Sequence, residues 1–352
     1  MNVYNVTFFI IVVILFLFCY FRLNSKALKI AFSFCPMLVL LACRGNDVGT
    51  DTYMYISLFD SLSSDEISYD NWAMIEPSFI FIVRMLHLIT DNNQALIIFY
   101  AVVTLLIIGY LFYKYSPNVE MGIVLFCSLF WLENFNTMRQ CLSVPISYLA
   151  IFCLLNDHKF KFLLINFVAM LVHSSATLFF LLILIYPFSR RKIVSAMIVA
   201  SLCCFLFVQF ELDILSIFLS EKYASYFLDI NYSTGKQMGI GILKAIAFLC
   251  IVFYALILPK YYKNNDAKGK MVYCMSMLLF CSTIVTFLQY EMNIFSRLVY
   301  PMSFSILFLF PQIWNDFGYK RYFLYPIVIV FLFFYLNRFS VIANDLEYSF
   351  FT

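Results

Sequence analysis

Charged side chains are scarce in this sequence. Only 12% of its 352 residues are Asp, Glu, Lys or Arg, and 64% are hydrophobic. Soluble domains carry about 25% charged residues, and a chain with far fewer cannot cover its surface against water. A soluble globular domain is therefore excluded. The net charge of +3 is small and no basic stripe alternates with exposed aromatic residues, so we expect no nucleic-acid partner.

Cofactor and metal motifs are also missing. The 11 cysteines lie singly or as the pair Cys203-Cys204 inside apolar runs, with no C-x-x-C spacing and no companion histidines. This pattern predicts packing residues, without disulfides or a metal site. The sequence contains no G-x-G-x-x-G fingerprint, Walker loop, H-E-x-x-H or G-x-S-x-G. We therefore expect no cofactor.

Long apolar runs dominate the sequence instead. A bilayer core about 30 Å thick is crossed by about 20 apolar helical residues, and runs near this length recur from end to end. They predict an all-α polytopic integral membrane protein with a single transmembrane domain over residues 1–352. The first run has no basic region before it and no cleavage site after it, so we expect a retained helix. The clearest spans are 5–20, 27–43, 94–113, 120–135, 141–155, 193–210, 239–258, 271–289, 297–313 and 322–337.

The loop charges predict the orientation of these helices. Short loops rich in Lys and Arg mark the cytoplasmic side of a membrane protein. Two acidic connections, within 44–93 and at 211–238, are expected to be periplasmic loops. The basic connections can all be cytoplasmic and the acidic ones periplasmic only if 76–90 does not cross and 162–188 crosses twice with a break at His173. This topology gives about 12 transmembrane helices, in a range of about 10 to 13. The basic connections are 21–29, 158–161, 189–192, 260–270 and 320–321.

The segment 76–90 has its own polar pattern. On a helical wheel with 100° per residue, Glu76, Arg84, His87 and Asp91 fall within about 80° of one another. This favours an amphipathic helix in the periplasmic interface. An ordinary helix whose Arg84 points inward is the alternative.

Ionisable residues gather near the expected outer ends of the helices. Such residues are costly in a membrane protein and are functional candidates by default. Guanidinium groups of Arg44, Arg139 and Arg297 could hold phosphate with paired donors. The carboxylates of Asp51 and Glu76 could orient or deprotonate a hydroxyl group, and so could the imidazole of His173.

Each candidate also has a structural explanation. Arg297 could reach the interface along its apolar stem, and Arg139 could cap a helix end against Glu133. Asp51 could be a loop or capping residue. His173 could be a packing residue whose polar atoms are satisfied.

Five short motifs carry a resemblance to a known family. The stretch from Arg44 through Val48-Gly49-Thr50-Asp51-Thr52, followed by Tyr55, resembles the EpsG family of bacterial exopolysaccharide and O-antigen polymerases. The resemblance spans about residues 40 to 310 in family order. Cys141-Leu142-Ser143 replaces the usual small apolar residues, and Pro77 stands where a glycine is common. The other four motifs are Glu76-Pro77-Ser78-Phe79, Met138-Arg139-Gln140, Ala169 to Ala176 around His173, and Arg297-x-x-Tyr300.

The resemblance implies a Wzy-type polymerase with a GT-C-like fold in the bacterial inner membrane, active at the periplasmic face. Such an enzyme transfers a glycan from undecaprenyl diphosphate onto the non-reducing end of a lipid-linked repeat unit. The implied partners are this lipid-linked oligosaccharide, membrane lipid and a chain-length regulator, and arginines would replace a metal. The implied site residues are Asp51, Glu76 and His173 as base candidates, Arg139 and Arg297 for diphosphate, Arg44 for diphosphate or glycan, and Tyr55, Gln140 and Tyr300 for substrate binding.

Two other functions remain open from the sequence. An O-antigen ligase shares the donor but usually has one long late periplasmic loop, whereas the longest expected outer loop here follows the second helix. A non-enzymatic glycolipid flippase or transporter would place ionisable residues at midplane depth, often within inverted repeats. In this sequence they gather at one face, and no repeat is visible.

Overall fold

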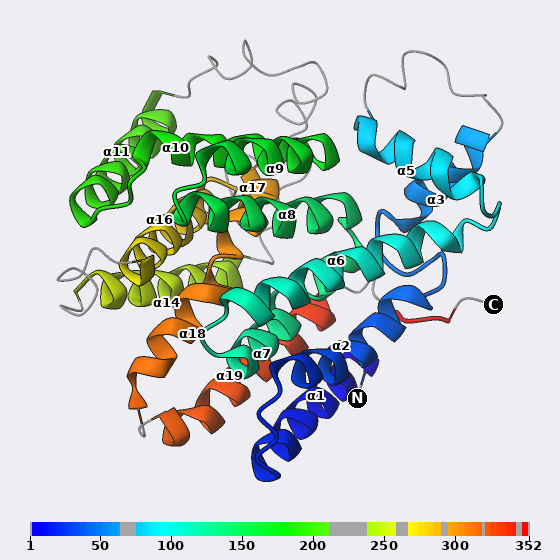
Figure 1. Cartoon of the computed structure of the whole chain (residues 1–352), viewed down its shortest axis with the longest axis horizontal. Coiled ribbons are helices and arrows are strands. Elements are labelled where there is room, and N and C mark those ends of the chain that lie inside the picture. The colour runs from blue at the N-terminus through cyan, green and yellow to red at the C-terminus, as the bar shows by residue number, and fades with distance from the viewer. Residues whose placement is uncertain are drawn as a thin grey trace. The chain divides into compact units, whose positions relative to one another are not determined.

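Helices make up almost all of the described structure (Figure 1). The computed structural model describes residues 2–63, 75–210, 238–257, 267–289, 295–318, 321–342 and 347–350. Within these ranges there is no strand, only an isolated antiparallel bridge between Arg44 and Phe350. The expected all-α fold is confirmed. The predicted loop 211–238, except its last residue, lies outside the described residues, as do 64–74 of the first loop and most of the basic connection 260–270.

Four helices in the described ranges are long and apolar enough to cross a membrane by length and composition. This supports a membrane protein, while the count of about 12 crossings and the GT-C-like fold stay predictions. The four helices are α1 (Val3–Tyr20), α6 (Gln94–Tyr115), α8 (Met138–Leu155) and α16 (Ala267–Leu288).

The chain divides into two compact units. Unit 1 consists of residues 1–150, 164–177 and 314–352, and unit 2 consists of residues 151–163 and 178–313.

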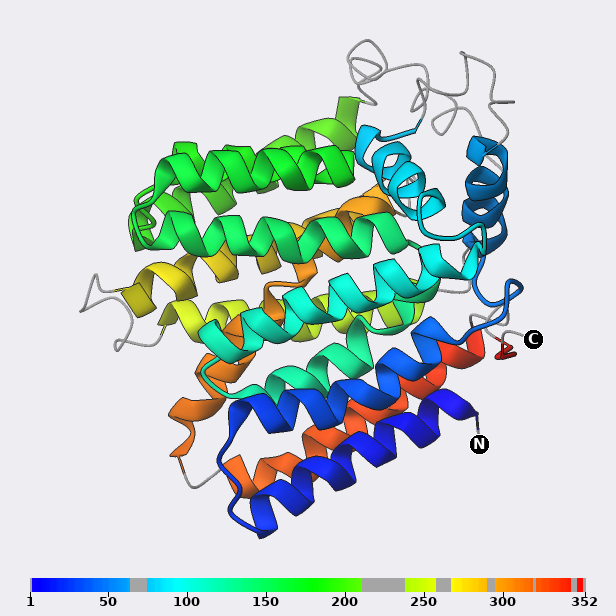
Figure 2. The ribbon, with the colours of Figure 1, turned by 45° about the vertical axis from the view of Figure 1, so that its right-hand side comes forward.

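Unit 1 is built on a layer of neighbouring helices, which Figure 2 shows running alongside one another. In it α1, α2 (Lys26–Ala42), α6, α7 (Val119–Leu129) and α19 (Arg321–Ile342) contact each other. Polar side chains join them at two points. Lys29 of α2 forms an ion pair with Glu120 of α7, and the Asn5 side-chain amide donates to Asn337 Oδ1 at 2.8 Å.

In unit 2, α16 contacts α11 (Arg190–Phe210), α14 (Met238–Ile257) and α17 (Ser296–Ser303). The expected span 297–313 is not one continuous helix, because α17 ends at Ser303 and α18 (Ile306–Asp316) begins after a turn, and its crossing of the membrane stays a prediction. Pro301 lies within α17, two residues before its end. Around the turn, the Ser305 hydroxyl donates to the Met302 carbonyl at 2.8 Å.

Two further runs end earlier than the apolar pattern suggests. The span expected at 120–135 stops at Leu129 and continues as a short 3₁₀ helix, η1 (Leu132–Phe135). The run 162–188 breaks at His173, as expected. There α9 (Lys159–Val172) ends and a 3₁₀ stretch, η2 (Ser174–Leu181), begins before α10 (Leu182–Ile185). Its double crossing stays a prediction.

The region after α2 forms two short helices, α3 (Thr52–Ser63) and α5 (Pro77–His87). Pro77 at the first position of α5 suits a helix start, because its missing N–H would have no intrahelical acceptor there. α5 packs on α3 and α6. Phe79 and Val83 are buried in this packing, while Arg84 is exposed.

Candidate active site

The loop from Arg44 to Asp51 is docked on η1 by its backbone. Gly49 has a φ of +97°, and a Cβ atom there would lie 2.1 Å from the Phe135 carbonyl oxygen. Only glycine fits this position. The Thr50 N–H donates to Asn136 Oδ1 at 2.9 Å, and the Thr52 hydroxyl donates to the Val48 carbonyl at 2.7 Å. These contacts fix where α3 begins.

Three of the predicted site residues form one buried cluster. Arg139, in the first turn of α8, makes an ion pair with Glu76 just before α5, and the exposed fractions of the two side chains are 14% and 11%. The guanidinium carbon of Arg139 also lies 5.2 Å from the ring centre of Tyr55 on α3 and 5.4 Å from that of Phe79. Residues from three separate motifs thus meet at one point.

In the Arg139 cluster some polar atoms are hydrogen-bonded, and others have no partner among the described residues. Arg139 is hydrogen-bonded to Tyr55, and burial raises the pKa of the Tyr55 phenol while the guanidinium opposes that rise. Among the described residues, however, the buried Nε of Arg139 has no hydrogen-bond partner, and neither has the hydroxyl of Tyr100 on α6. Tyr100 is an electrostatic neighbour of both Arg139 and Glu76. Two donors therefore face this cluster without an acceptor, which is costly unless a ligand supplies one.

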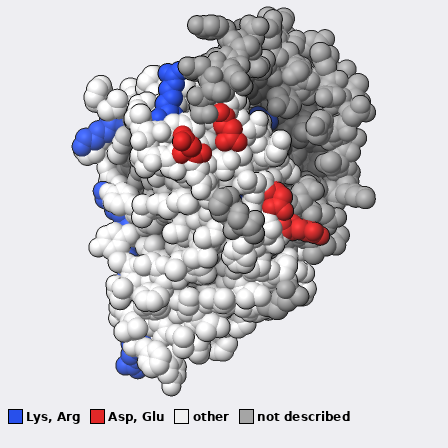
Figure 3. Space-filling view, turned by 90° about the vertical axis from the view of Figure 1, so that its right-hand side faces the viewer, with Lys and Arg blue, Asp and Glu red and all other residues white. Residues whose placement is uncertain are grey.

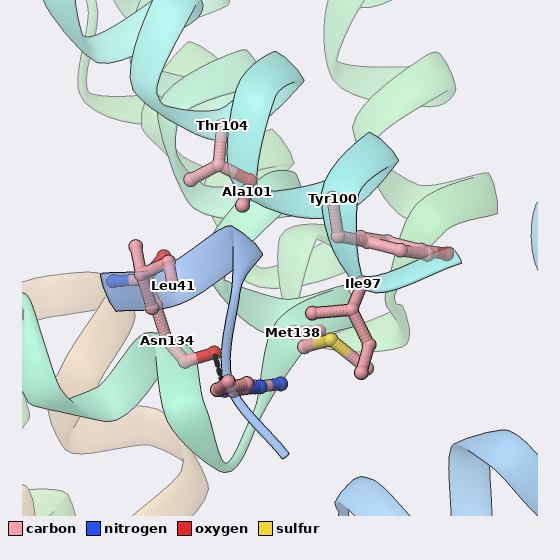
Figure 4. Close-up of a pocket in the computed structure, with 8 residues that line it drawn as sticks. Leu41, Ile97, Tyr100, Ala101, Thr104, Asn134 and Met138 are labelled. Atoms are coloured by element: carbon pink, nitrogen blue, oxygen red, sulfur yellow. Dashed lines mark hydrogen bonds between the residues drawn. The ribbon is translucent and has the colours of Figure 1, made fainter. Parts of the chain in front are cut away.

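Arg44 adjoins a small pocket whose lining residues are drawn in Figure 4. Its exposed fraction is 1%. Its Nη1 donates to the Asn134 carbonyl at 3.2 Å, and its guanidinium carbon lies 5.2 Å from the Phe135 ring centre. Its Nε and Nη2 have no hydrogen-bond partner among the described residues. Burial lowers the pKa of Arg44 to about 10, so the group remains charged at neutral pH.

A small cavity adjoins Arg44. The space in it is about 10 Å³, which is room for about one water molecule. One water or one anionic oxygen would fit, whereas a whole diphosphate would not. The expected contact of Arg44 with diphosphate or glycan stays a prediction. The cavity lining also includes Leu41, Ile97, Tyr100, Ala101, Thr104, Asn134 and Met138.

Hydrogen bonds join α9, which ends just before His173, to the segments that carry Glu76 and Arg139. The Ser78 hydroxyl, two residues after Glu76, donates to the Leu171 carbonyl at 2.8 Å, and the Ser143 hydroxyl of α8 donates to the Ala169 carbonyl at 2.8 Å. The Nδ1 atom of His173 accepts the Ser175 N–H at 3.2 Å.

This contact sets the tautomer of His173. A ring nitrogen that accepts a backbone N–H carries no proton, so neutral His173 holds its proton on Nε2. In this state Nε2 is a donor, which suits binding an oxygen better than accepting a proton.

The remaining predicted residues divide between the units. In unit 1, Asp51 is half-buried and is an electrostatic neighbour of Tyr55, and Gln140 is buried beside Arg139 in the sequence. In unit 2, Arg297 is exposed in the first turn of α17 and Tyr300 is buried. Their expected place in the same site as Arg139 stays a prediction.

Acidic side chains mark this end of unit 1. Figure 3 faces the side that carries α3 and α5, and Asp and Glu side chains gather in the part of it that is described. This fits a loop outside the membrane, as the acidic composition of 44–75 predicts.

Sequence reasoning missed two features of this region. Tyr100 lies in a long apolar run, and one of 25 tyrosines in such a chain carries no distinguishing pattern. The segment 347–350 returns to the loop after α2, where the Gly45 N–H donates to the Ser349 carbonyl at 2.8 Å. No local motif in the sequence indicates that contact.

Apolar helices long enough to cross a bilayer, with a buried cluster of Arg, Glu and Tyr beside an acidic loop, define a helical membrane protein with a polar site near one end of unit 1. The chain matches the model of the EpsG family over residues 27–351, nearly its whole length, and belongs to that family. The resemblance in the motifs is thereby confirmed, and the EpsG family includes Wzy-type polymerases. No curated protein and no solved structure matches the chain.

Proposed function

We propose that this protein is a Wzy-type polysaccharide polymerase of the bacterial inner membrane. It transfers a glycan from undecaprenyl diphosphate to the non-reducing end of a lipid-linked repeat unit at the periplasmic face. The observation that carries the proposal is the Arg139 cluster. Tyr55, Glu76 and Arg139 come from three motifs typical of the family, and they meet in one buried cluster that still has unused donors.

Arg139 is the group that binds the departing diphosphate. One of its Nη atoms pairs with Glu76, and its Nε has no acceptor among the described residues. A phosphate oxygen at Nε would complete the guanidinium fork, and charge-assisted bonds of this kind are about twice as strong as neutral ones. As the sugar–phosphate bond breaks, negative charge grows on the diphosphate, so a fixed guanidinium stabilises the transition state more than the ground state.

Asp51 is the group that accepts the proton. The acceptor hydroxyl attacks the anomeric carbon, the bond to the diphosphate oxygen breaks, and the diphosphate leaves with the electron pair. The hydroxyl proton passes to a carboxylate. Glu76 is held by Arg139, and His173 accepts a backbone N–H at Nδ1. We assign the base to Asp51, which is half-buried and an electrostatic neighbour of Tyr55 in the Arg139 cluster, while Glu76 orients the guanidinium of Arg139.

Deletion of the gene in its bacterial host tests the proposal. We expect gels of the surface polysaccharide to show single repeat units on their anchor and no ladder, with the ladder restored by the wild-type gene. A mutant without any anchored glycan would indicate a ligase, and one with units trapped inside the cell would indicate a flippase. Either result would overturn the polymerase proposal.

A further inference from the structure

The C-terminal segment 347–350 is bound to the loop after α2. The Gly45 N–H donates to the Ser349 carbonyl at 2.8 Å, and Arg44 and Phe350 form an antiparallel bridge. The Tyr348 hydroxyl donates at 3.2 Å to the Leu40 carbonyl. That carbonyl is in the last turn of α2, where backbone acceptors have no intrahelical donor.

A side-chain contact connects the same segment to the loop's acidic residue. The Ser349 hydroxyl donates to a carboxylate oxygen of Asp47. The approach is close, because a Cβ atom on Gly45 would lie 2.3 Å from Ser349 Oγ and 2.6 Å from Asp47 Oδ1. Glycine at position 45 therefore permits the segment to dock.

The docked segment also surrounds Arg44. The Tyr348 ring packs edge-on against Tyr4, with ring centres 6.2 Å apart. It packs in the same way against Phe350 at 5.0 Å. Tyr4 and Tyr348 are both electrostatic neighbours of Arg44, whose exposed fraction is 1%. The segment thus helps to bury a charged group that lies within the same loop as Asp51.

We propose that Ser349 is a positioning residue for the loop from Arg44 to Asp51. It touches no substrate itself. Its bonds to Asp47 and Gly45 hold the loop in one conformation, so that Asp51 and Arg44 are already in place when the substrate arrives. The inference rests on the proposed polymerase function, and it adds a residue from a segment whose sequence carries no recognised motif. The family match reaches residue 351 and so includes this segment.

The test uses purified full-length protein with a synthetic undecaprenyl-diphosphate-linked repeat unit. Loss of one hydrogen bond to a carboxylate corresponds to a change on the order of tenfold. We expect Ser349→Ala to raise KM by about that factor, with kcat and thermal stability nearly unchanged. Ser349→Thr retains the hydroxyl and should restore KM. Glu347→Ala is the matched control, because Glu347 is exposed in the same segment.

A double variant separates positioning from general damage. If Ser349 acts through Asp47, the variant with both Ser349→Ala and Asp47→Ala should be no worse than Asp47→Ala alone, since contacting residues are not additive. Hydrogen exchange of the peptide containing Gly45 should also speed up in Ser349→Ala. Unchanged KM in Ser349→Ala, with an active wild-type protein, would overturn this inference alone. A wild-type protein that makes no polymer would overturn the proposed function and this inference with it.

Discussion

Two partly buried ion pairs of unit 1 differ in how completely their polar atoms are paired. The pair of Lys29 with Glu120 joins α2 to α7, and neither residue has a buried polar atom without a hydrogen-bond partner. Glu120 also lies in the first turn of α7, where the helix dipole favours a negative charge. The pair of Arg139 with Glu76 leaves the Nε of Arg139 without a partner among the described residues.

The two pairs also differ in their surroundings. Lys29 is in the first turn of α2 and Arg44 follows the last, so the Lys29 pair and the Arg44 loop are about 20 Å apart along the helix axis. At the Lys29 end, Asn118 and Asn315 bond to each other at 3.1 Å, although the buried hydroxyl of Ser33, one helical turn after Lys29, has no hydrogen-bond partner among the described residues. At the Arg139 end, aromatic faces and unused donors adjoin the pair. Burial of an ion pair alone therefore does not identify a site, and the Arg139 pair differs because a donor of the pair itself, the Arg139 Nε, has no hydrogen-bond partner among the described residues.

The largest effect is expected from the carboxylates near Arg139. We expect Asp51→Asn to lower kcat by about 10²- to 10⁴-fold, the usual cost of losing a general base. Glu76→Gln should cost less, because it loosens Arg139 without removing the proton acceptor. Rates at saturating substrate, measured across pH for both variants and for His173→Ala, decide between them. Near-wild-type turnover in all three would show that none of them is the base.

Exchanging arginine and lysine in each ion pair tests whether the two pairs have different roles in activity. Arg139→Lys keeps the charge but loses the planar fork, and we expect polymerisation to fall by about 10²-fold while the protein still inserts. The mirror change, Lys29→Arg, should leave activity per folded molecule unaltered. Chain length on gels and turnover of purified protein are the measurements. Wild-type chain lengths in Arg139→Lys would assign Arg139 a purely structural role.

Two glycines with positive φ, Gly49 and Gly318, differ in their surroundings and so test how far the site depends on the backbone of the loop after α2. At Gly49 an added Cβ would meet the Phe135 backbone at 2.1 Å, whereas at Gly318, with a φ of +57°, it would meet nothing within 4 Å. Gly49→Ala should displace the loop and reduce activity strongly. Gly318→Ala should cost only about 1 to 2 kcal/mol of stability, from the left-handed backbone alone. Thermal unfolding and turnover of both variants test this difference, and equal activities would contradict a site that depends on the loop.

The smallest effect is expected at Tyr100. Its hydroxyl is buried without a hydrogen-bond partner among the described residues, so Tyr100→Phe should not lower thermal stability. If the hydroxyl donates to the substrate, KM should rise by up to about tenfold. An unchanged KM would mean that this hydroxyl stays unpaired in the complex as well.

The helical class and the candidate residues that form the Arg139 cluster could be selected from the sequence for a physical reason. Segments that cross lipid must be long and apolar, so the composition and the apolar runs predict a helical membrane protein. Charged residues are costly there, so Arg139 and Glu76 stood out from their neighbours. Their pairing with each other could not be predicted, because it depends on how α5 and α8 pack. The sequence offered Glu133 as the partner of Arg139, and the structure places Glu76 there instead.

Helix interruptions were harder to predict from hydropathy. Leu129 to Phe135 is apolar enough to continue α7, but the chain turns there into η1, on which the loop after α2 docks. The break after Ser303 follows Pro301, but α2, α8, α18 and α19 each continue past an internal proline, so neither break could be predicted from a local signal. The same holds for Ser349, since a short tail has no periodicity from which a contact could be deduced.

The contact between Tyr4 and Tyr348 bears on the number of times the chain crosses the membrane. The two residues lie near opposite ends of the chain, and their rings are 6.2 Å apart beside the loop after α2. We expect both rings to lie outside the membrane on the same side, which requires an even number of crossings between Tyr4 and Tyr348, in keeping with the predicted count of about 12. Reporters fused beyond either residue should then sense the same compartment, and different compartments would contradict an even count.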